Sequence, residues 1–332
     1  MTVVSNTSEA LDSPYTNALE HMLTETRAHA LDSSVKEIDR LAIAHDASHY
    51  LLVPAGIVRP DSAEAVADIF RAASAFNLPL TFRSGGTSLS GQASGDGVMV
   101  DTRRNFKKIE VLDDGKRVRV QPGATVMAVN NMLAPYGYKL GPDPASWSAC
   151  TIGGVVANNS SGMSSGTEFN TYNTLESMVF VLPSGTVIDT SAPDADARLR
   201  ALEPEIHEGL LRLRKRVVEN PESVARIRQQ YSMKNTMGYG VNSLLDYSTP
   251  VDILQHLLIG SEGTLGFVAS ATYRTLPIHK FVSTGLLVFD NLLEATRSVP
   301  ELVANHLATV ELMDATSIRV AQRTGQAAEA LA

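Results

Sequence analysis

RSGGTSLSGQ (residues 83–92) is followed in the chain by two further stretches of the same character, GPDP (residues 141–144) and TIGGVVANNSSG (residues 151–162). Glycine and small hydroxylated residues dominate the first and last of these stretches. A loop of this composition lets the backbone come close to a ligand and directs successive N–H groups toward one anionic centre. Two such loops, separated by a predicted strand pair and a helix, predict a two-part cradle for the pyrophosphate of a dinucleotide.

Neither of the familiar nucleotide-binding motifs fits these loops. Gly86 and Gly91 have the spacing of a P-loop, but Gln92 and Ala93 stand where that motif needs its lysine and its magnesium-binding hydroxyl. A Rossmann motif requires a helix directly after its glycines, whereas here more loop and a strand-like segment at residues 98–102 follow. These features argue against an ATPase and against a Rossmann domain.

Length and composition narrow the class of protein further. The chain has 332 residues, 44% of them hydrophobic, a net charge of −8 and an isoelectric point near 5.5. This balance suits an acidic enzyme of one large domain plus a smaller piece, and it argues against a surface for nucleic acid or anionic membranes. Cys150 stands alone, which excludes an internal disulfide or a site needing several thiolates. With no signal peptide and no spanning apolar run in this sequence, we expect a cytoplasmic protein.

The first part of the chain predicts a helical lead and then a β-α-β unit. Residues 1–48 carry apolar side chains at helical spacing, namely Leu19, Met22, Leu23, Leu31, Val35, Ile38 and Leu41. A short apolar strand at residues 51–60, broken by Pro54, and a helix capped by Asp61 or Ser62 precede a strand that runs into the first glycine loop. This order places the glycines at the carboxyl end of a strand, where α/β proteins bind ligands.

The rest of the chain, after the first glycine loop, predicts two hairpins, several helices and the start of a second domain. Asp113-Asp114-Gly115 and Ser184-Gly185 are hairpin turn signals. The pattern predicts helices at residues 125–136, 199–218, 221–231 and 252–258, and a strand at residues 267–277. A strand at residues 281–289, a helix at 291–304, a strand at 308–314 and the start of a helix then form a β-α-β piece.

Taken in order, five motifs carry a resemblance to a known family: RSGGTSLSGQ, GPDP, CTIGGVVANNSSG, KNTMGYG (residues 234–240) and GSEGTLG (residues 260–266). The chain resembles the FAD-linked oxidoreductases of the vanillyl-alcohol oxidase and p-cresol methylhydroxylase fold. Within them it is similar to the D-2-hydroxy-acid dehydrogenase branch, which includes D-lactate dehydrogenase, the glycolate oxidase large subunit and D-2-hydroxyglutarate dehydrogenase. The resemblance runs from about residue 50 to residue 277.

This resemblance implies an α+β fold with three parts. Residues 1–48 are the helical lead, residues 49–277 are a two-subdomain FAD-binding domain of the p-cresol methylhydroxylase type, and residues 278–332 are the incomplete start of an α+β cap. In the related branch, catalytic and metal-binding histidines lie in a cap stretch of the kind HxGDGNxH, which this sequence lacks. The chain is therefore expected to be an N-terminal portion of a longer protein, and no catalytic base is assigned.

The resemblance also implies which residues hold the cofactor. One wall, which should wrap the pyrophosphate and reach the flavin end, comprises Ser84, Gly85, Gly86, Thr87, Ser88 and Gln92. The opposite wall comprises Pro142, Asp143, Thr151, Gly153, Gly154, Asn158, Ser161 and Gly162. Glu262, Gly263 and the backbone near Val268 are expected close to the ribose or adenine. Lys234 is expected nearest the flavin ring, where a cation would stabilise the negative charge that develops as hydride arrives.

Thr87 bears on how the cofactor is held, and a histidine pair bears on metal binding. Covalent relatives carry a histidine at the position of Thr87, and because threonine cannot form that bond to the flavin, FAD is expected to be held noncovalently. His45 and His49, four residues apart, could share a helix face as metal ligands. Without an acidic or thiol partner at a defined spacing, we interpret them as surface or capping residues and expect no metal.

The implied function is oxidation of a small D-2-hydroxy acid such as lactate, glycolate or 2-hydroxyglutarate, with hydride transfer to flavin N5. The electron acceptor would be a quinone, an electron-transfer flavoprotein or an iron–sulfur protein. Two alternatives stay open: a noncatalytic FAD-binding subunit that relays electrons within a complex, and a reductase of the same fold that consumes NADPH to act on a nucleotide sugar.

Overall fold

The structure is a computed structural model, and it describes residues 13–25, 32–236, 238–305 and 307–324. The first of its two main sheets has four strands in the order β1 (Asp32–Ser34), β2 (Gly56–Arg59), β4 (Val98–Asp101), β3 (Leu80–Arg83). Strands β2, β4 and β3 are parallel, and β1 joins the edge antiparallel to β2. The carboxyl ends of the three parallel strands therefore lie at one edge of the sheet, where the first glycine-rich loop begins.

The second main sheet is antiparallel and has five strands. Their order is β5 (Ile109–Leu112), β6 (Arg117–Val120), β10 (Phe267–Arg274), β8 (Leu175–Val181), β9 (Val187–Asp189). The tight turn η2 (Asp113–Gly115) joins β5 to β6, and Gly185 has a positive φ in the turn between β8 and β9. Both predicted hairpins are confirmed. A short ribbon pairs β7 (Tyr138–Lys139) with β11 (Leu276–Pro277).

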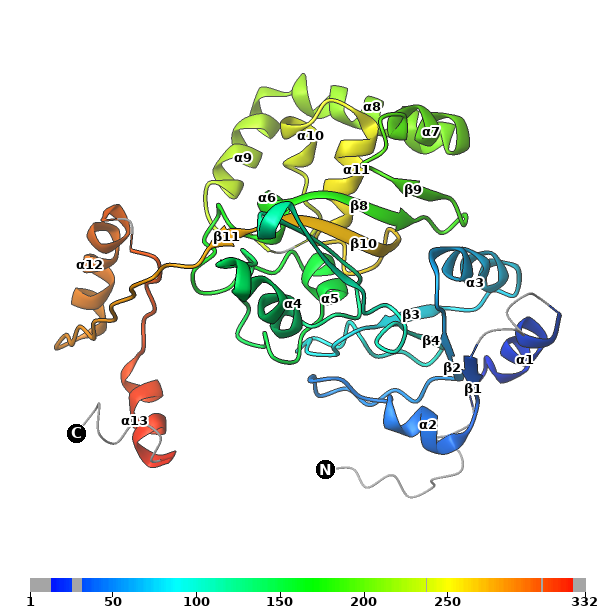
Figure 1. The fold of residues 1–332 in the computed structure, drawn as a ribbon, viewed down its shortest axis with the longest axis horizontal. Coiled ribbons are helices and arrows are strands. Elements are labelled where there is room, and N and C mark those ends of the chain that lie inside the picture. The colour runs from blue at the N-terminus through cyan, green and yellow to red at the C-terminus, as the bar shows by residue number, and fades with distance from the viewer. Residues whose placement is uncertain (1–12, 26–31, 237, 306, 325–332) are drawn as a thin grey trace.

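Helix α3 (Ala63–Ala75) and a group of aromatic rings connect the two sheets. Ser62 caps α3 by accepting a hydrogen bond from the Ala65 N–H, as the sequence predicted. Phe267 of β10 stacks on Phe82 of β3 with 5.0 Å between ring centroids, and it meets Phe106 edge-on at 5.4 Å. This packing fixes the first sheet against the second, and Figure 1 shows the two sheets side by side with α3 at their junction.

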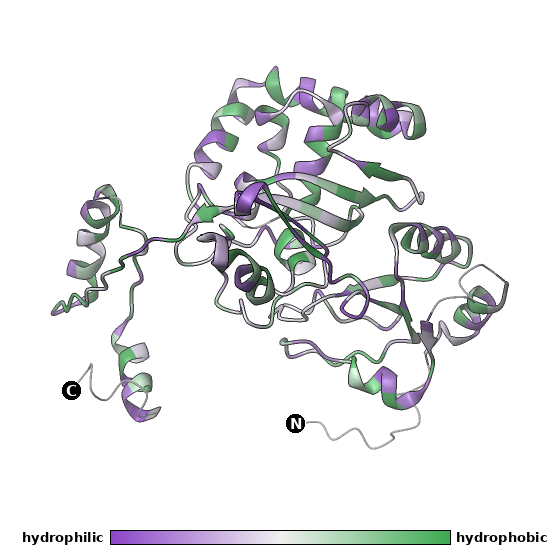
Figure 2. Cartoon of the chain, viewed as in Figure 1, coloured by the Kyte–Doolittle hydropathy of each residue, from purple (hydrophilic) through white to green (hydrophobic). Residues whose placement is uncertain are grey.

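The other helices lie mainly over the second sheet. They are α4 (Val126–Leu133), η3 (Ala134–Tyr136), α5 (Ile152–Ala157), α6 (Thr171–Thr174), α7 (Ala195–Leu202), α8 (Pro204–Val218), α9 (Pro221–Tyr231), α10 (Ser243–Asp246) and α11 (Pro250–Leu258). Figure 2 shows mostly hydrophobic residues along the strands of this sheet and alternating hydrophobic and hydrophilic residues along α8 and α9. Such alternation is typical of helices that bury one face and leave the other in water.

The α+β class with two subdomains is confirmed, but the N-terminal lead differs from the prediction. Helix α1 (Thr16–Glu25) buries Leu19 and Met22 against the first sheet. Beyond it the expected helix gives way to strand β1 and the short helix α2 (Glu37–Ala42), whose apolar residues Ile38 and Leu41 are exposed. Leu31 lies outside the described residues. Pairing with β2 satisfies the backbone of residues 32–34, and that pairing outweighed the helical spacing.

Two further predictions are wrong in detail. The helix predicted at residues 199–218 is divided into α7 and α8, because Pro204 at the start of α8 cannot continue the preceding helix. Residues 281–289 and 308–314 are extended but are not strands, since the described part of the chain places no strand beside them. Helices α12 (Leu292–Ala304) and α13 (Ala315–Thr324) stand apart from the two-sheet body (Figure 1).

Candidate cofactor-binding site

A cleft with a volume of about 610 Å³ lies where the two sheets meet. Three segments contribute most of its lining: the loop at residues 84–93 after β3, the region of α5 at residues 150–160, and residues 258–268 at the start of β10. Phe267, which joins the sheets, also lines the cleft. The site is therefore an interface between the two subdomains, and its shape depends on their packing.

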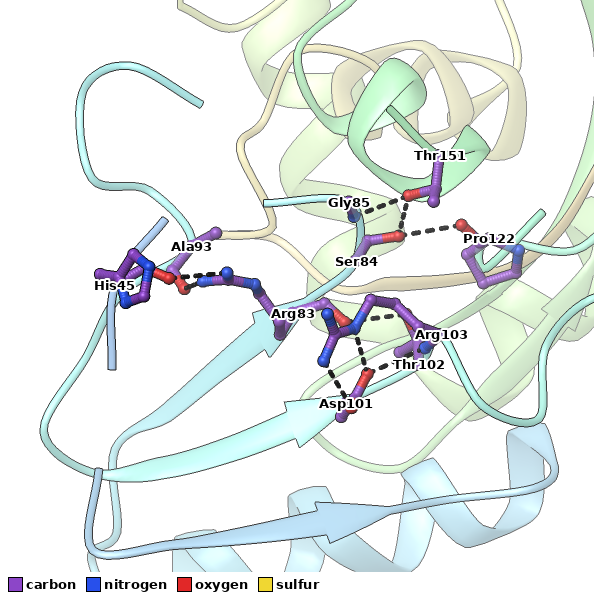
Figure 3. Close-up of polar contacts among 10 residues, drawn as sticks. All are labelled: His45, Arg83, Ser84, Gly85, Ala93, Asp101, Thr102, Arg103, Pro122 and Thr151. Carbon is purple, nitrogen blue, oxygen red and sulfur yellow. Dashed lines mark hydrogen bonds and ion pairs between the residues drawn. The ribbon is translucent and has the colours of Figure 1, made fainter. Parts of the chain in front are cut away.

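The start of the loop at residues 84–93 is hydrogen-bonded to residues beside α5, which form the opposite wall of the cleft. Ser84 Oγ donates to the Pro122 carbonyl oxygen at 2.9 Å, and the Gly85 N–H donates to Thr151 Oγ1 at 2.9 Å. Ser84 Oγ and Thr151 Oγ1 also form a hydrogen bond (Figure 3). A Cβ on Gly85 would come within 2.9 Å of the Ala149 carbonyl oxygen, so this close approach of the two walls requires glycine.

Beyond this fastening, the loop presents unsatisfied backbone donors. Among the residues that the structure describes, none accepts a hydrogen bond from the N–H groups of Gly86, Thr87, Ser88 and Leu89. Gly86 has a φ of 68°, a left-handed conformation that glycine adopts readily. Consecutive free N–H groups in a turned loop form a concavity that favours an anion.

The second wall is formed by the N-terminal part of α5. The Gly153 N–H donates to the Pro122 carbonyl oxygen at 2.9 Å, so the same carbonyl group joins both walls. A Cβ on Gly153 would lie 2.8 Å from the Pro122 ring, whereas a Cβ on Gly154 would meet no atom within 4 Å. Gly153 is thus required for packing, and Gly154 leaves open space at the cleft.

Glu262 belongs to the third segment and has an unusual backbone and an altered acidity. Its φ is 52°, its N–H donates to the Ala157 carbonyl oxygen at 2.8 Å, and its Oε1 accepts a hydrogen bond from Asn158 Nδ2 at 2.7 Å. Burial raises the pKa of Glu262, and the Asn158 bond offsets this only in part. The third segment is thereby joined to the second wall.

Replacing Glu262 with glutamine should make the apoprotein more stable at neutral pH. Because the folded-state pKa of Glu262 is raised, its ionisation removes stability as pH rises from the unfolded value of about 4.3 through the folded value. Glutamine keeps the acceptor for Asn158 and cannot ionise. The melting temperature of Glu262→Gln, measured between about pH 4 and pH 8, should exceed that of the parent increasingly toward the alkaline end.

The exposed Glu301 of α12 provides the control for this prediction, and Glu301→Gln should leave the pH profile of melting unchanged. If the melting temperatures of Glu262→Gln and the parent change with pH in parallel, ionisation of the buried Glu262 carboxyl does not affect stability.

Most of the residues assigned to the cradle from the sequence line the cleft. These are Ser84, Gly85, Gly86, Thr87, Ser88, Gln92, Thr151, Gly153, Gly154, Asn158, Glu262, Gly263 and Val268. Pro142, Asp143, Ser161 and Gly162 lie outside its lining in an adjoining group, where the Asp143 N–H donates to the Ser161 carbonyl oxygen at 2.8 Å. Lys234 Nζ donates to the Gly162 carbonyl oxygen at 3.0 Å and so belongs to this adjoining group.

Several residues that shape the cleft are absent from the set predicted from the sequence. Pro122 accepts hydrogen bonds from both walls, and Ser160, Ser261, Thr264 and Phe267 line the cavity. The dipeptide Pro122-Gly123 is a turn signal that could have placed a bend at the site. Nothing in the local sequence marks Phe267, since an aromatic residue in a strand is most often part of the core.

The chemistry of the lining suits a diphosphate held by backbone and hydroxyl groups. In the described part of the chain, the cleft is lined by no lysine or arginine, and its ionisable side chains are Glu262 and Cys150. Burial raises the pKa of the Cys150 thiol, which disfavours the thiolate. The described residues contain no cluster of His, Cys, Asp and Glu that could hold a metal ion, and His45 and His49 do not share a helix. None of the described helices has the length and apolarity needed to cross a membrane.

Comparison with known proteins agrees with this arrangement. Residues 54–191 match the model of a family described as the FAD binding domain. The chain is 28% identical over 303 residues to D-2-hydroxyglutarate dehydrogenase of Haemophilus influenzae, covering 88% of this chain and 29% of that protein. It is 27% identical over 308 residues to glycolate oxidase subunit GlcD of Escherichia coli, covering 91% of this chain and 51% of that subunit. The chain thus spans between about a third and a half of the length of these relatives.

Solved structures of low sequence identity share the fold. An alkyldihydroxyacetonephosphate synthase matches with a TM-score of 0.58 at 19% identity, covering 89% of this chain and 51% of that one. A glucooligosaccharide oxidase from Acremonium strictum, whose FAD is described as 6-S-cysteinyl and 8α-N1-histidyl, matches with a TM-score of 0.51 at 15% identity, covering 79% of this chain and 43% of that one. Residues 54–191 therefore match the FAD binding domain family, in a chain that is similar to a D-2-hydroxyglutarate dehydrogenase and to a glycolate oxidase subunit and that has the p-cresol methylhydroxylase fold.

Proposed function

We propose that the chain holds FAD noncovalently in the cleft between its two sheets and serves the oxidation of a small D-2-hydroxy acid. The observation that carries this proposal is the run of free N–H groups at residues 86–89, in a cleft that is also lined by Gly154, beside which there is open space. The names of the homologous dehydrogenases and of the glycolate oxidase subunit support the substrate class. Thr87, at the position of the histidine of covalent relatives, supports noncovalent binding.

The reaction requires a proton and a hydride to leave the substrate. The hydroxyl proton passes to a base while the α-hydrogen leaves with its electron pair, and FAD, when bound, supplies the acceptor for that hydride. The described residues of this chain contribute the binding cradle, with Phe267 closing the cleft between the sheets. Lys234 is proposed as the residue that stabilises developing charge at the flavin, and the full set of cradle residues named above is proposed to contact FAD.

The proposal extends to partners, boundaries and location. The electrons would pass to a quinone, an electron-transfer flavoprotein or an iron–sulfur protein. Residues 1–48 would form the lead, residues 49–277 the FAD-binding domain and residues 278–332 the start of the cap. The boundary between residues 277 and 278 is supported by the exposed segment at residues 281–289, which leads away from the two sheets. A cytoplasmic location is also proposed, and the single cysteine, Cys150, fits a reducing compartment.

The test is an anaerobic titration of the FAD-loaded protein. Bleaching of the flavin absorbance by D-lactate, glycolate or D-2-hydroxyglutarate, but not by L-lactate, is the expected result. Bleaching by dithionite alone would replace the proposal with the electron-relay function, and bleaching by NADPH would favour the reductase. A protein that retains no flavin after loading with excess FAD would remove the basis of the proposal.

A further inference from the structure

Residues 45–50, named here the N-terminal brace, lie against the loop at residues 83–93, and none of them lines the cleft. The Ala47 N–H donates to the Gly86 carbonyl oxygen at 3.0 Å, and the Ala93 N–H donates to Asp46 Oδ2 at 3.3 Å. Arg83 Nη2 donates to the His45 carbonyl oxygen at 2.7 Å (Figure 3). The brace thus bonds to the start, the middle and the end of the loop.

Arg83 is a buried cation directly behind the loop. Its exposed fraction is 7%, and Nη1 donates to the Ala93 carbonyl oxygen at 3.0 Å. Nε has no hydrogen-bond partner, and no carboxylate of the described residues lies within ion-pair distance of the guanidinium. A Cβ on Gly86 would come within 2.6 Å of this guanidinium. A positive charge therefore lies close to the backbone of Gly86, within the loop that carries the free N–H groups at residues 86–89.

Asp46 fixes the brace to the far end of the loop. Asp46 is 7% exposed. Its Oδ1 accepts a hydrogen bond from the Ser48 N–H at 2.8 Å, and its Oδ2 accepts one from the Ala93 N–H. Burial acts to raise the pKa of Asp46, but its hydrogen bonds and the charge of Arg83 outweigh burial, so the pKa lies below its ordinary value. At neutral pH the carboxylate is ionised and both oxygens are used.

Packing adds to these polar contacts. A Cβ on Gly91 would come within 2.6 Å of the Tyr50 ring, so the ring of the brace lies directly on the loop. Gly91 has a φ of 82°, which makes this turn of the loop specific to glycine. The brace precedes the part of the chain that matches the FAD binding domain family, which begins at residue 54.

We propose that the N-terminal brace sets the geometry of the anion-binding loop, with Asp46 and Arg83 as positioning residues, so that binding of FAD and ordering of residues 45–50 are coupled. This inference rests on the FAD-binding role proposed above. Free-energy coupling is reciprocal, so a brace that tightens FAD binding must itself be stabilised by FAD. The substitution Asp46→Ala should therefore weaken FAD binding although Asp46 does not line the cleft.

The experiment compares the FAD affinities of Asp46→Ala and Asp189→Ala in the full chain. Asp189 is an exposed aspartate that accepts from the Ser191 N–H in a similar turn, on the second sheet. Fluorescence titration should give an FAD dissociation constant about tenfold higher for Asp46→Ala, as expected for loss of a charge-assisted hydrogen bond, and an unchanged constant for Asp189→Ala. Asp46→Asn, which retains one acceptor oxygen, should lie between the parent and Asp46→Ala.

Hydrogen exchange of the parent protein provides a second measurement that does not depend on the variant folding. FAD should slow exchange of the Ala47 and Ala93 amides, which bond within this contact, and should leave the Ser191 amide unaffected. Unchanged affinity in Asp46→Ala, or unchanged exchange at both amides while FAD is bound, would overturn the proposal. Failure of the parent to bind FAD at all would instead contradict the proposed function.

Discussion

Gly154→Val is expected to abolish tight FAD binding while leaving the apoprotein folded. Gly154 lines the cleft in α5, and a Cβ built there meets no protein atom within 4 Å. The added isopropyl group would therefore fill space intended for the cofactor without displacing the protein, and valine is a better helix residue than glycine. Fluorescence titration should show the dissociation constant rising by at least roughly 100-fold, which corresponds to about 2.7 kcal/mol.

The control for this prediction is Gly209→Val. Gly209 also lies in a helix, α8, and the nearest atom to its added Cβ is Arg212 Nη2 at 3.8 Å, far from the cleft. Both variants should melt close to the parent in the absence of FAD. If Gly154→Val binds FAD as the parent does, the cofactor does not occupy the space beside α5.

Phe267→Ala is expected to lower the free energy of unfolding by about 4 kcal/mol, the usual range for removing a buried phenylalanine. Phe267 is 5% exposed, and its ring contacts Phe82 of the first sheet and Phe106 of the segment that links the sheets. Because the same ring lines the cleft, FAD affinity should fall together with stability. Urea denaturation followed by circular dichroism measures the first effect, and flavin fluorescence measures the second.

The matched control is Phe281→Ala, since Phe281 is 93% exposed in the segment that leaves the two-sheet body. This variant should stay within about 0.5 kcal/mol of the parent, as surface substitutions usually do. A loss in Phe267→Ala no larger than that of the control would mean that the aromatic contact does not hold the sheets together.

Local sequence signals predicted those features of the structure that depend only on residues close together in the chain. Ser62 before an apolar helical stripe predicted the start of α3, and Asp113-Asp114-Gly115 predicted the turn between β5 and β6. The glycine-rich loop at residues 83–92 predicted an anion-binding backbone, and the structure places free N–H groups there. These features depend on residues close to one another in the chain.

Long-range packing accounts for the predictions that were wrong or missed. Residues 281–289 have a strand-like composition, but a strand needs a neighbour, and the described part of the chain provides none. The apolar residues Leu31, Val35, Ile38 and Leu41 follow a helical spacing, yet residues 32–34 between them pair with β2, and Ile38 and Leu41 of α2 are exposed. Lys234, expected beside the flavin ring, donates a hydrogen bond to the Gly162 carbonyl oxygen in the group that adjoins the cleft, and its role at the flavin stays a prediction.

By itself the sequence determined both hairpins and the glycine-rich character of the loop at residues 83–92, because backbone conformation and hydrogen-bonding capacity are local properties of glycine, serine and threonine. The α+β class and most of the residues on the two walls of the cleft followed from the resemblance of its motifs to a known family. Only the tertiary structure decided that Pro122 joins the walls, that Phe267 joins the sheets and that Arg83 and Asp46 connect the loop to the N-terminal brace. These contacts link residues far apart in the chain, and their geometry follows from how the two sheets pack.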